Sequence, residues 1–166
     1  MTLDHLWAGW RHPYVTGAAA GGPDASIRQN TQPSGPPAAD NGVVWRGDTA
    51  LAVLNAYPYA SGHLLVMPRR HVAGFDDLEP GESAELWAAT QRAVAAVDAA
   101  YRPDGMNLGA NLGRAAGAGI PQHLHLHVVP RWSGDTNFMT AVAGVRVIPE
   151  ALDDSWRRLH GAWPAA

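Results

Sequence analysis

The sequence of 166 residues contains no cysteine and few charged residues. The absence of cysteine excludes a disulfide framework and thiolate metal sites, and it is typical of a reducing compartment. Charged residues make up 16% of the chain and the formal net charge is −3, so no basic surface for nucleic acid is expected. An anionic ligand must therefore be held by a local site.

Long apolar runs are missing as well. No segment approaches the ~20 residues of a membrane helix, and the first 15 residues lack the charged-then-apolar layout of a signal peptide. Hydrophobic residues nevertheless make up 46% of the chain, which is enough to build the core of one domain. We therefore expect a cytoplasmic protein with no membrane or nucleic-acid partner.

The composition divides the chain into three parts. Residues 1–16 mix aromatic and polar side chains and predict an arm that packs on the domain or on a second subunit. Residues 17–42 are rich in glycine, alanine and proline without any period, which predicts a mobile linker. Residues 43–166 then form the folded domain.

The patterning of this domain predicts an α+β fold with an antiparallel sheet. Two apolar stretches flank Gly47 and Asp48 and indicate a hairpin. The run "HLLVMP" indicates a buried strand that stops at Pro68, and the glycine-broken "MNLGANLG" indicates another. A strand at 145–148 and a short helix at 151–161 complete the chain.

One long helix is predicted between these strands, over residues 81–101. Glu82 and Glu85 lie in its first turns, where the helix dipole favours anions. Its apolar residues recur at spacings of three and four, as a helix that covers a sheet requires: Leu86, Ala89, Ala93 and Val97.

The segment "PQHLHLHVVPRW" carries three histidines at alternating positions. In a strand, side chains alternate between faces, so His123, His125 and His127 should share one face. The other face receives the apolar residues between them. Packing on a sheet explains such a group poorly, because buried imidazoles without partners cost stability. Two chemical interpretations remain, a metal site and nucleophilic catalysis.

The neighbouring residues favour phosphate chemistry over a metal. Histidine ligands are usually oriented by carboxylates, and no Asp or Glu lies between Gly105 and Arg131. The segment Gly117–Ile120 is instead glycine-rich, and such loops present backbone N–H groups to phosphate oxygens. A neutral imidazole is also a competent nucleophile near neutral pH.

These residues resemble the histidine triad (HIT) family of nucleotide hydrolases and transferases. The family signature is His-φ-His-φ-His-φ-φ, in which φ is an apolar residue, and the segment "HLHLHVV" matches it at every position. The stretches "LNAYPYASGHLLVMPRRH", "MNLGANLGRAAGAGIP" and "VVPRWSGDTNFM" resemble its bacterial branch of diadenosine tetraphosphate phosphorylases and hydrolases. The resemblance implies a HIT-like fold, an antiparallel sheet of about five strands with one long helix and a short C-terminal helix. It also implies a homodimer with a continuous sheet.

The resemblance assigns a role to each histidine. His125 would attack the α-phosphorus and form a covalent nucleotidyl-histidine, with its other ring nitrogen oriented by a backbone carbonyl. His127 would contact the α-phosphate and the leaving oxygen, and His123 would hold the imidazole network. His63 would support the triad from the neighbouring strand, although a strand-end histidine is the alternative reading.

The same resemblance places nucleotide contacts elsewhere. Asn55 would bind ribose and Asn111 would reach the nucleotide or the leaving group, and either amide could instead close a turn. Trp132 and Asn137 would line the pocket, or Trp132 would pack in the core. The phosphate would meet the loop and the residue before the triad: Gly117, Ala118, Gly119, Ile120 and Gln122.

The sequence also departs from the family pattern. Many relatives carry a Cys-x-x-Cys zinc site after the arm, which this chain lacks, so no metal is expected and His71 is interpreted as a surface histidine. Relatives tend to have an acid at Gln122 and often an aromatic residue at Leu126. Both changes bear on the substrate and the acceptor more than on the triad.

The predicted function is cleavage of a dinucleoside polyphosphate, such as diadenosine tetraphosphate, with water or inorganic phosphate as acceptor. No cofactor is expected in the protein, while magnesium can accompany the substrate. The alternatives are a hydrolase of nucleoside phosphoramidates or nucleotide conjugates, a nucleotide-binding protein without catalysis, and a metal-binding module.

Overall fold

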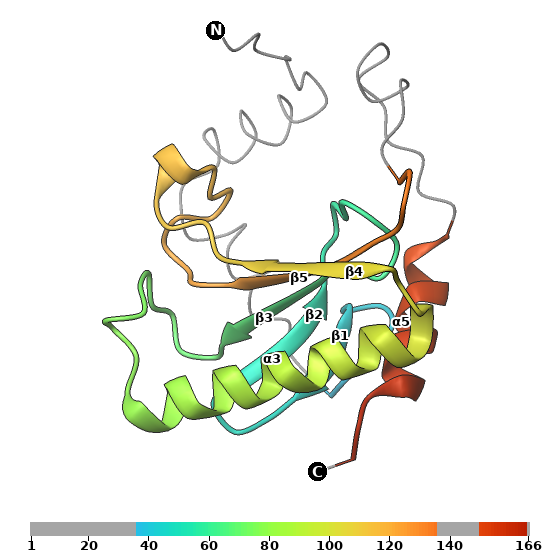
Figure 1. Ribbon diagram of the computed structural model, residues 1–166. Helices are drawn as coiled ribbons and strands as arrows, with labels where there is room; N and C mark the ends of the chain where they lie inside the picture. The colour runs from blue at the N-terminus through green and yellow to red at the C-terminus, as the bar shows by residue number, and fades with distance from the viewer. Residues whose placement is uncertain (1–35, 136–149, 166) are drawn as a thin grey trace, which may run out of the picture.

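The computed structural model describes residues 36–135 and 150–165, and it has an α+β architecture in which two helices pack on one five-stranded sheet (Figure 1). All neighbouring strands are antiparallel, in the order β1-β2-β3-β5-β4. The predicted arm at 1–16 and the strand candidate at 145–148 lie outside the described residues. The elements are β1 (Val43–Arg46), β2 (Ala50–Leu54), β3 (Leu64–Pro68), α3 (Pro80–Tyr101), β4 (Gly105–Gly109), the 3-10 turn η2 (Arg114–Ala116), β5 (Leu126–Arg131) and α5 (Leu152–Ala162).

The predicted hairpin is confirmed as β1 and β2, and its turn is tied to the long helix. The carboxylate of Glu85 accepts hydrogen bonds from the N–H of Asp48 at 2.9 Å and from the N–H of Thr49 at 2.6 Å. It also accepts one from the hydroxyl of Thr49. Glu85, expected only to favour the helix dipole, therefore also anchors the hairpin on α3.

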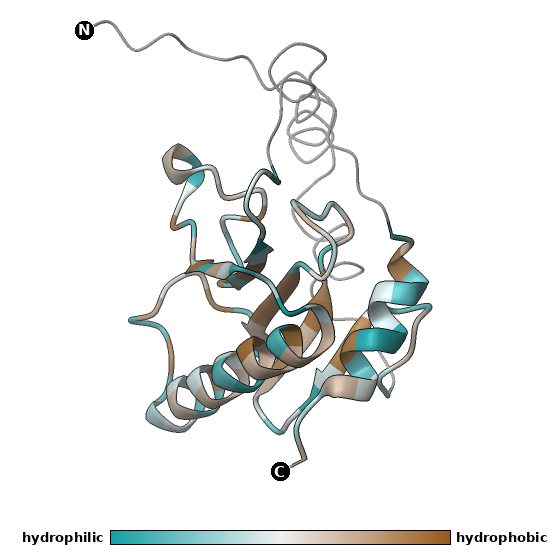
Figure 2. Ribbon diagram, turned by 45° about the vertical axis from the view of Figure 1, so that its right-hand side comes forward, coloured by the Kyte–Doolittle hydropathy of each residue, from teal (hydrophilic) through white to brown (hydrophobic). Residues whose placement is uncertain are grey.

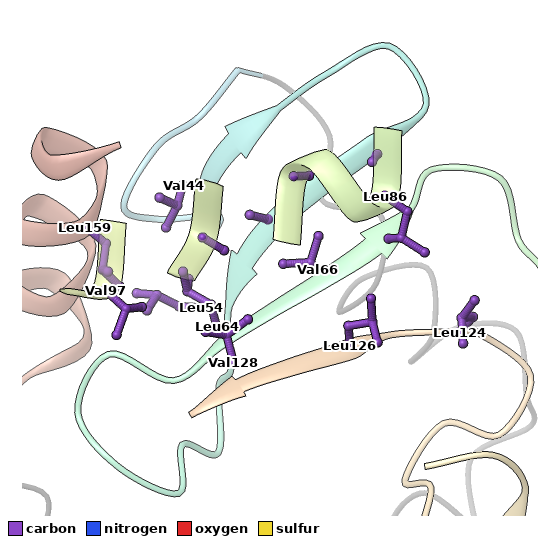
Figure 3. Close-up of a cluster of buried hydrophobic side chains, with 14 of the residues drawn as sticks. Val44, Leu54, Leu64, Val66, Leu86, Val97, Leu124, Leu126, Val128 and Leu159 are labelled. Carbon is purple, nitrogen blue, oxygen red and sulfur yellow. The ribbon is translucent and has the colours of Figure 1, made fainter. Parts of the chain in front are cut away.

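Helix α3 covers one face of the sheet and buries the predicted apolar stripe (Figure 3). It begins at Pro80, one residue before the predicted start, because proline suits the first helical turn, where its missing N–H is not needed. In Figure 2 the apolar colouring is concentrated on the strands that α3 covers. The buried cluster joins helix and strand residues: Val44, Leu54, Leu64, Val66, Leu86, Ala89, Ala93, Val97, Leu126 and Val128.

The start of α3 is held by a buried carboxylate. Glu82 accepts two hydrogen bonds from the guanidinium of Arg70, at 2.8 and 2.6 Å, and one from the N–H of Glu79 at 2.9 Å. The hydrogen bonds from Arg70, and to a smaller extent the one from Glu79, lower the pKa of Glu82 from 4.5 to about 2. Glu82 thus joins the segment after β3 to the helix.

The histidine segment forms a shorter strand than predicted. Strand β5 begins at Leu126, so His127 lies in the strand while His123 and His125 precede it. The reason is Pro68, which would oppose Leu124 in the register of β3 and β5 but has no N–H to donate. The N–H of Leu124 donates instead to the carbonyl of Val72 at 2.7 Å.

The predicted alternation of faces nevertheless holds through this segment. Leu124, Leu126 and Val128 all point into the core under α3 (Figure 3). The backbone therefore stays extended past the end of the regular pairing. The histidines between these residues are turned to the opposite face of the sheet.

The two edges of the sheet differ. Helix α5 lies beside β1 (Figure 1) and satisfies carbonyls of that edge: the indole N–H of Trp156 donates to Val43 at 2.7 Å, and Nδ1 of His160 donates to Val44 at 2.9 Å. At the other edge, β4 ends at Gly109, earlier than the predicted strand, and is largely exposed. Among the described strands, β4 pairs only with β5.

Residues 36–42, predicted as the end of the mobile linker, form a defined turn. The side-chain oxygen of Asn41 accepts hydrogen bonds from the N–H of Ala38 at 3.2 Å and of Val43 at 3.0 Å. The amide nitrogen of Asn41 donates to the carbonyl of Pro36 at 2.9 Å. One carboxamide thus organises the entry to β1. The helices of the described residues include none that could cross a membrane.

Candidate active site

A chain of hydrogen bonds joins the β2–β3 turn to the histidines. The N–H of Tyr59 donates to Nδ1 of His63 at 3.0 Å, so this nitrogen is an acceptor and the proton of the neutral ring lies on Nε2. Nε2 of His63 lies 2.9 Å from Nδ1 of His127 and donates to it. The proton of neutral His127 must then lie on its own Nε2.

Asn55 lies at the start of this chain. Its side-chain nitrogen is 3.3 Å from Nδ1 of His63, and its side-chain oxygen accepts from the N–H of Tyr57 at 2.9 Å. The backbone N–H of Asn55 also donates to the carbonyl of His63 at 3.0 Å. Asn55 therefore supports the His63 tautomer, and its contact with ribose stays a prediction.

His125 carries its proton on Nδ1, the opposite of His63 and His127. Its Nδ1 lies 2.9 Å from the carbonyl oxygen of His123, and because a carbonyl only accepts, Nδ1 carries the proton. Nε2 then keeps a free lone pair, which is what an imidazole nucleophile needs. The ring of His125 meets that of His127 edge-on, with centroids 5.0 Å apart. A nitrogen lone pair on His125 and an N–H on His127 thus belong to two rings in contact.

His123 is buried and is held against a residue that the sequence suggested to be a simple surface histidine. Its ring stacks on that of His71, with centroids 5.0 Å apart and planes 17° from parallel. Burial, and secondarily the neighbours His71 and His125, lower the pKa of His123 from 6.5 to about 4. His123 therefore stays neutral near pH 7 and presents its carbonyl to His125.

The glycine loop is partly closed on itself. The N–H of Gly117 donates to the carbonyl of Arg114 at 3.0 Å, and that of Ala118 donates to Gly113 at 3.3 Å. Among residues 36–135 and 150–165, no hydrogen bond uses the N–H of Gly119 or Ile120. Of the predicted phosphate-binding amides, these two are therefore the ones that the loop leaves available.

The remaining predicted residues lie around this loop or beyond it. The amide of Asn111 donates to the carbonyl of Gly117 at 3.5 Å, and Gln122 is half-buried directly before the triad. Trp132 is half-buried and packs edge-on against Tyr101, with centroids 6.3 Å apart, so its place in the pocket or in the core stays a prediction. Asn137 lies outside the described residues.

Sequence reasoning missed Tyr59 and the stacking of His71. Both contacts form between segments far from the triad in sequence, so periodicity carries no signal for them. The described part of the chain contains no group of three or more histidine, aspartate or glutamate side chains placed to hold a metal ion.

The chain is similar to known proteins over most of its length. A family model described as HIT domain matches residues 37–134. The AP-4-A phosphorylase of Mycobacterium tuberculosis, strain H37Rv, is 44% identical to this chain over 172 residues, covering 97% of this chain and 85% of that protein.

Solved structures show the same fold. A zinc-bound histidine triad family protein from Mycobacterium smegmatis superposes with a TM-score of 0.60 at 33% identity, covering 72% of this chain and 81% of that one. A hypothetical histidine triad nucleotide-binding protein from Sulfolobus tokodaii gives a TM-score of 0.61 at 27% identity, over 73% and 82% of the two chains. The predicted HIT-like architecture is confirmed.

Proposed function

Because this chain belongs to the HIT domain family, we propose that it cleaves a dinucleoside polyphosphate at the α-phosphate through a covalent nucleotidyl-histidine. The observation that carries the proposal is the hydrogen bond from Nδ1 of His125 to the carbonyl of His123 at 2.9 Å. It leaves the Nε2 lone pair of His125 directed away from the backbone that orients the ring. A histidine with a purely structural role would not need a free Nε2 lone pair next to the Nε2–H of His127.

In the first step, the Nε2 lone pair of His125 forms a bond to the α-phosphorus. The bond from phosphorus to the bridging oxygen breaks, and its electron pair leaves with the polyphosphate. The Nε2–H of His127 donates a hydrogen bond to the departing oxygen, where charge develops. The carbonyl of His123 stabilises the positive charge that the His125 ring acquires, since Nδ1 keeps its proton throughout.

In the second step, the same phosphorus is attacked by an oxygen of inorganic phosphate, or by the oxygen of a water molecule that releases one proton to solvent. The bond from phosphorus to Nε2 breaks and its electron pair returns to His125. Splitting one difficult displacement into two lowers each barrier. His63 maintains the tautomer of His127 in both steps, because its own Nδ1 is occupied by the N–H of Tyr59.

Binding of the nucleotide falls to the residues around the histidines. The amides of Gly119 and Ile120 would hold phosphate oxygens, in a loop that Gly117 and Ala118 close. Asn55 is proposed to bind ribose, while Asn111 and Gln122 approach the leaving group. The protein is proposed to need no metal of its own, magnesium arriving with the polyphosphate, and to act in the cytoplasm.

The substrate follows from the similarity to a protein named AP-4-A phosphorylase. Incubating the pure protein with diadenosine tetraphosphate should therefore release ATP in both acceptor conditions. With inorganic phosphate the second product should be ADP, and in water alone it should be AMP, as mass spectrometry of the products would show. A protein that leaves the compound intact under both conditions would disprove the proposed substrate.

We further propose a homodimer in which the β4 strands of two copies pair. The β1 edge is covered by Trp156 and His160 of α5, whereas β4 is an exposed edge with apolar side chains. Leu108, in β4, and Leu112, just beyond it, are each 51% exposed. An unprotected apolar edge strand is a template for pairing with another strand, and a twofold axis would satisfy both copies at once.

Replacing Leu108 with lysine should convert the dimer to a monomer, because two like charges would meet across the twofold axis. Light scattering coupled to size-exclusion chromatography measures the mass directly. The control is Leu152→Lys, a leucine on α5 that is 41% exposed. Loss of the dimer in the control alone, or a monomeric wild type, would argue against pairing through β4.

A further inference from the structure

The ring of Tyr59 contacts the rings of His63 and His127, the two histidines joined by a hydrogen bond. It is nearly parallel to the ring of His127, with centroids 5.7 Å apart and planes 17° from parallel. It also contacts the ring of His63, with centroids 4.6 Å apart and planes at 45°. The same residue donates its backbone N–H to Nδ1 of His63 at 3.0 Å. Tyr59 thus contacts both members of the His63–His127 pair, one of them twice.

The turn that carries Tyr59 is braced at several points, so the position of its ring is well defined. The N–H of Asn55 donates to the carbonyl of His63 at 3.0 Å, and the N–H of His63 donates to the carbonyl of Ala60 at 3.2 Å. Gly62 adopts a left-handed φ of +80° that returns the chain to β3. A ring mounted on such a turn moves little relative to His63 and His127.

From this arrangement we infer that Tyr59 is a positioning residue for the reaction: its ring fixes the plane of His127 so that the Nε2–H of His127 stays aimed at the leaving oxygen. His63 contacts His127 through a hydrogen bond at Nδ1, and a single hydrogen bond resists rotation about its own axis only weakly. A nearly parallel aromatic ring restrains that rotation, because offset stacking favours one mutual orientation. The backbone N–H of Tyr59 determines that the protons of His63 and, through it, His127 lie on Nε2. The ring of Tyr59 determines the direction of the Nε2–H of His127.

This inference rests on the proposed function and predicts a dependence on the leaving group. A departing oxygen that holds its electrons poorly depends more on a donated hydrogen bond in the transition state. Misorienting His127 should therefore slow the cleavage of a poor leaving group more than that of a good one. A role in overall stability, or in binding the nucleoside, would affect both equally.

The test compares Tyr59→Ala, Tyr59→Leu and Tyr59→Phe with the wild type. All three keep the backbone N–H, and phenylalanine also keeps the ring. The substrates are diadenosine tetraphosphate and two aryl esters of AMP, the phenyl ester and the p-nitrophenyl ester. For Tyr59→Ala we expect kcat on diadenosine tetraphosphate to fall by about 10- to 100-fold with KM nearly unchanged. The fall should be greater on the phenyl ester than on the p-nitrophenyl ester, and Tyr59→Phe should restore the wild-type rates.

Tyr57→Ala is the matched control, since Tyr57 lies two residues away in the same turn with 58% of its surface exposed. It should show no dependence on the leaving group. If Tyr59→Ala fails to fold, Tyr59→Leu preserves more of the apolar contact and carries the same expectation. An equal loss on both esters, or an equal effect of the Tyr57 variant, would overturn the inference.

A second readout separates this inference from the proposed function. Nitrogen-15 NMR of the imidazoles should show both His63 and His127 protonated at Nε2 in the wild type. In Tyr59→Ala the signals of His127 should broaden or shift while those of His63 keep the Nε2–H pattern. If the wild type cleaves none of the three substrates, the proposed function fails, and unchanged His127 signals in Tyr59→Ala would reject the positioning role independently.

Discussion

Replacing His125 with alanine should abolish turnover of diadenosine tetraphosphate while nucleotide binding remains measurable. The variant loses the ring whose Nδ1–H donates to the carbonyl of His123, and with it the Nε2 lone pair that we propose to attack phosphorus. Loss of a covalent nucleophile costs on the order of 10⁴- to 10⁶-fold in kcat. Initial rates measured by product chromatography, together with calorimetric titration of AMP, would show the two effects separately.

The covalent step offers a direct check on this expectation. Acid quenching of the wild type during turnover should trap a protein species heavier by one adenylyl group, and the His125 variant should show none. His160→Ala is the control, because this histidine lies on α5 and donates to Val44. A His125 variant with a near wild-type rate, or an adduct that maps to another residue, would refute the mechanism.

Replacing Gly62 with alanine should strongly lower the free energy of unfolding. Gly62 has φ of +80°, which an L side chain rarely adopts, and a Cβ there would lie 2.5 Å from the ring carbon Cε2 of Tyr101. Tyr101 cannot easily move away, because its hydroxyl donates to Glu150 at 2.6 Å. Backbone strain and overpacking together should lower the free energy of unfolding by about 2–4 kcal/mol.

Urea denaturation followed by circular dichroism measures this change, and the melting temperature should fall by roughly 5 to 15 °C. The control is Gly81→Ala, since a Cβ at Gly81 would meet nothing within 4 Å and alanine favours the helix. Gly62 directly precedes His63, so the variant should also lose activity. A melting temperature equal to that of the wild type would mean that the turn tolerates a side chain at position 62 and that the ring of Tyr101 moves aside.

Much of the fold could be predicted from periodicity, because each signal involved neighbours in the sequence. The spacing of Leu86, Ala89, Ala93 and Val97 located the face of α3 that covers the sheet. The hairpin at Gly47 and Asp48 followed from turn residues between apolar runs. The start of β5 was predicted too early, because the missing N–H of Pro68 acts across the sheet and shows only when the register is known.

The candidate site divides in the same way. The alternation in "HLHLHVV" was enough to put three histidines on one face, and that face does lie opposite the core formed by Leu124, Leu126 and Val128. The protonation pattern was beyond the reach of the sequence, since it depends on the N–H of Tyr59 and on the carbonyl of His123. His71 appeared to be an ordinary surface residue until its ring was found on that of His123.

The sequence by itself therefore determined the α+β class, the family and the identity of the histidines. These properties follow from local spacing, which turns side chains to one face or another wherever the chain is helical or extended. Only the tertiary structure decided which ring nitrogen carries the proton in His63, His125 and His127, and which aromatic ring lies against His127. Those properties depend on hydrogen bonds and ring contacts, several of them between residues many positions apart, which exist only once the β2–β3 turn, the segment after β3 and β5 are packed together.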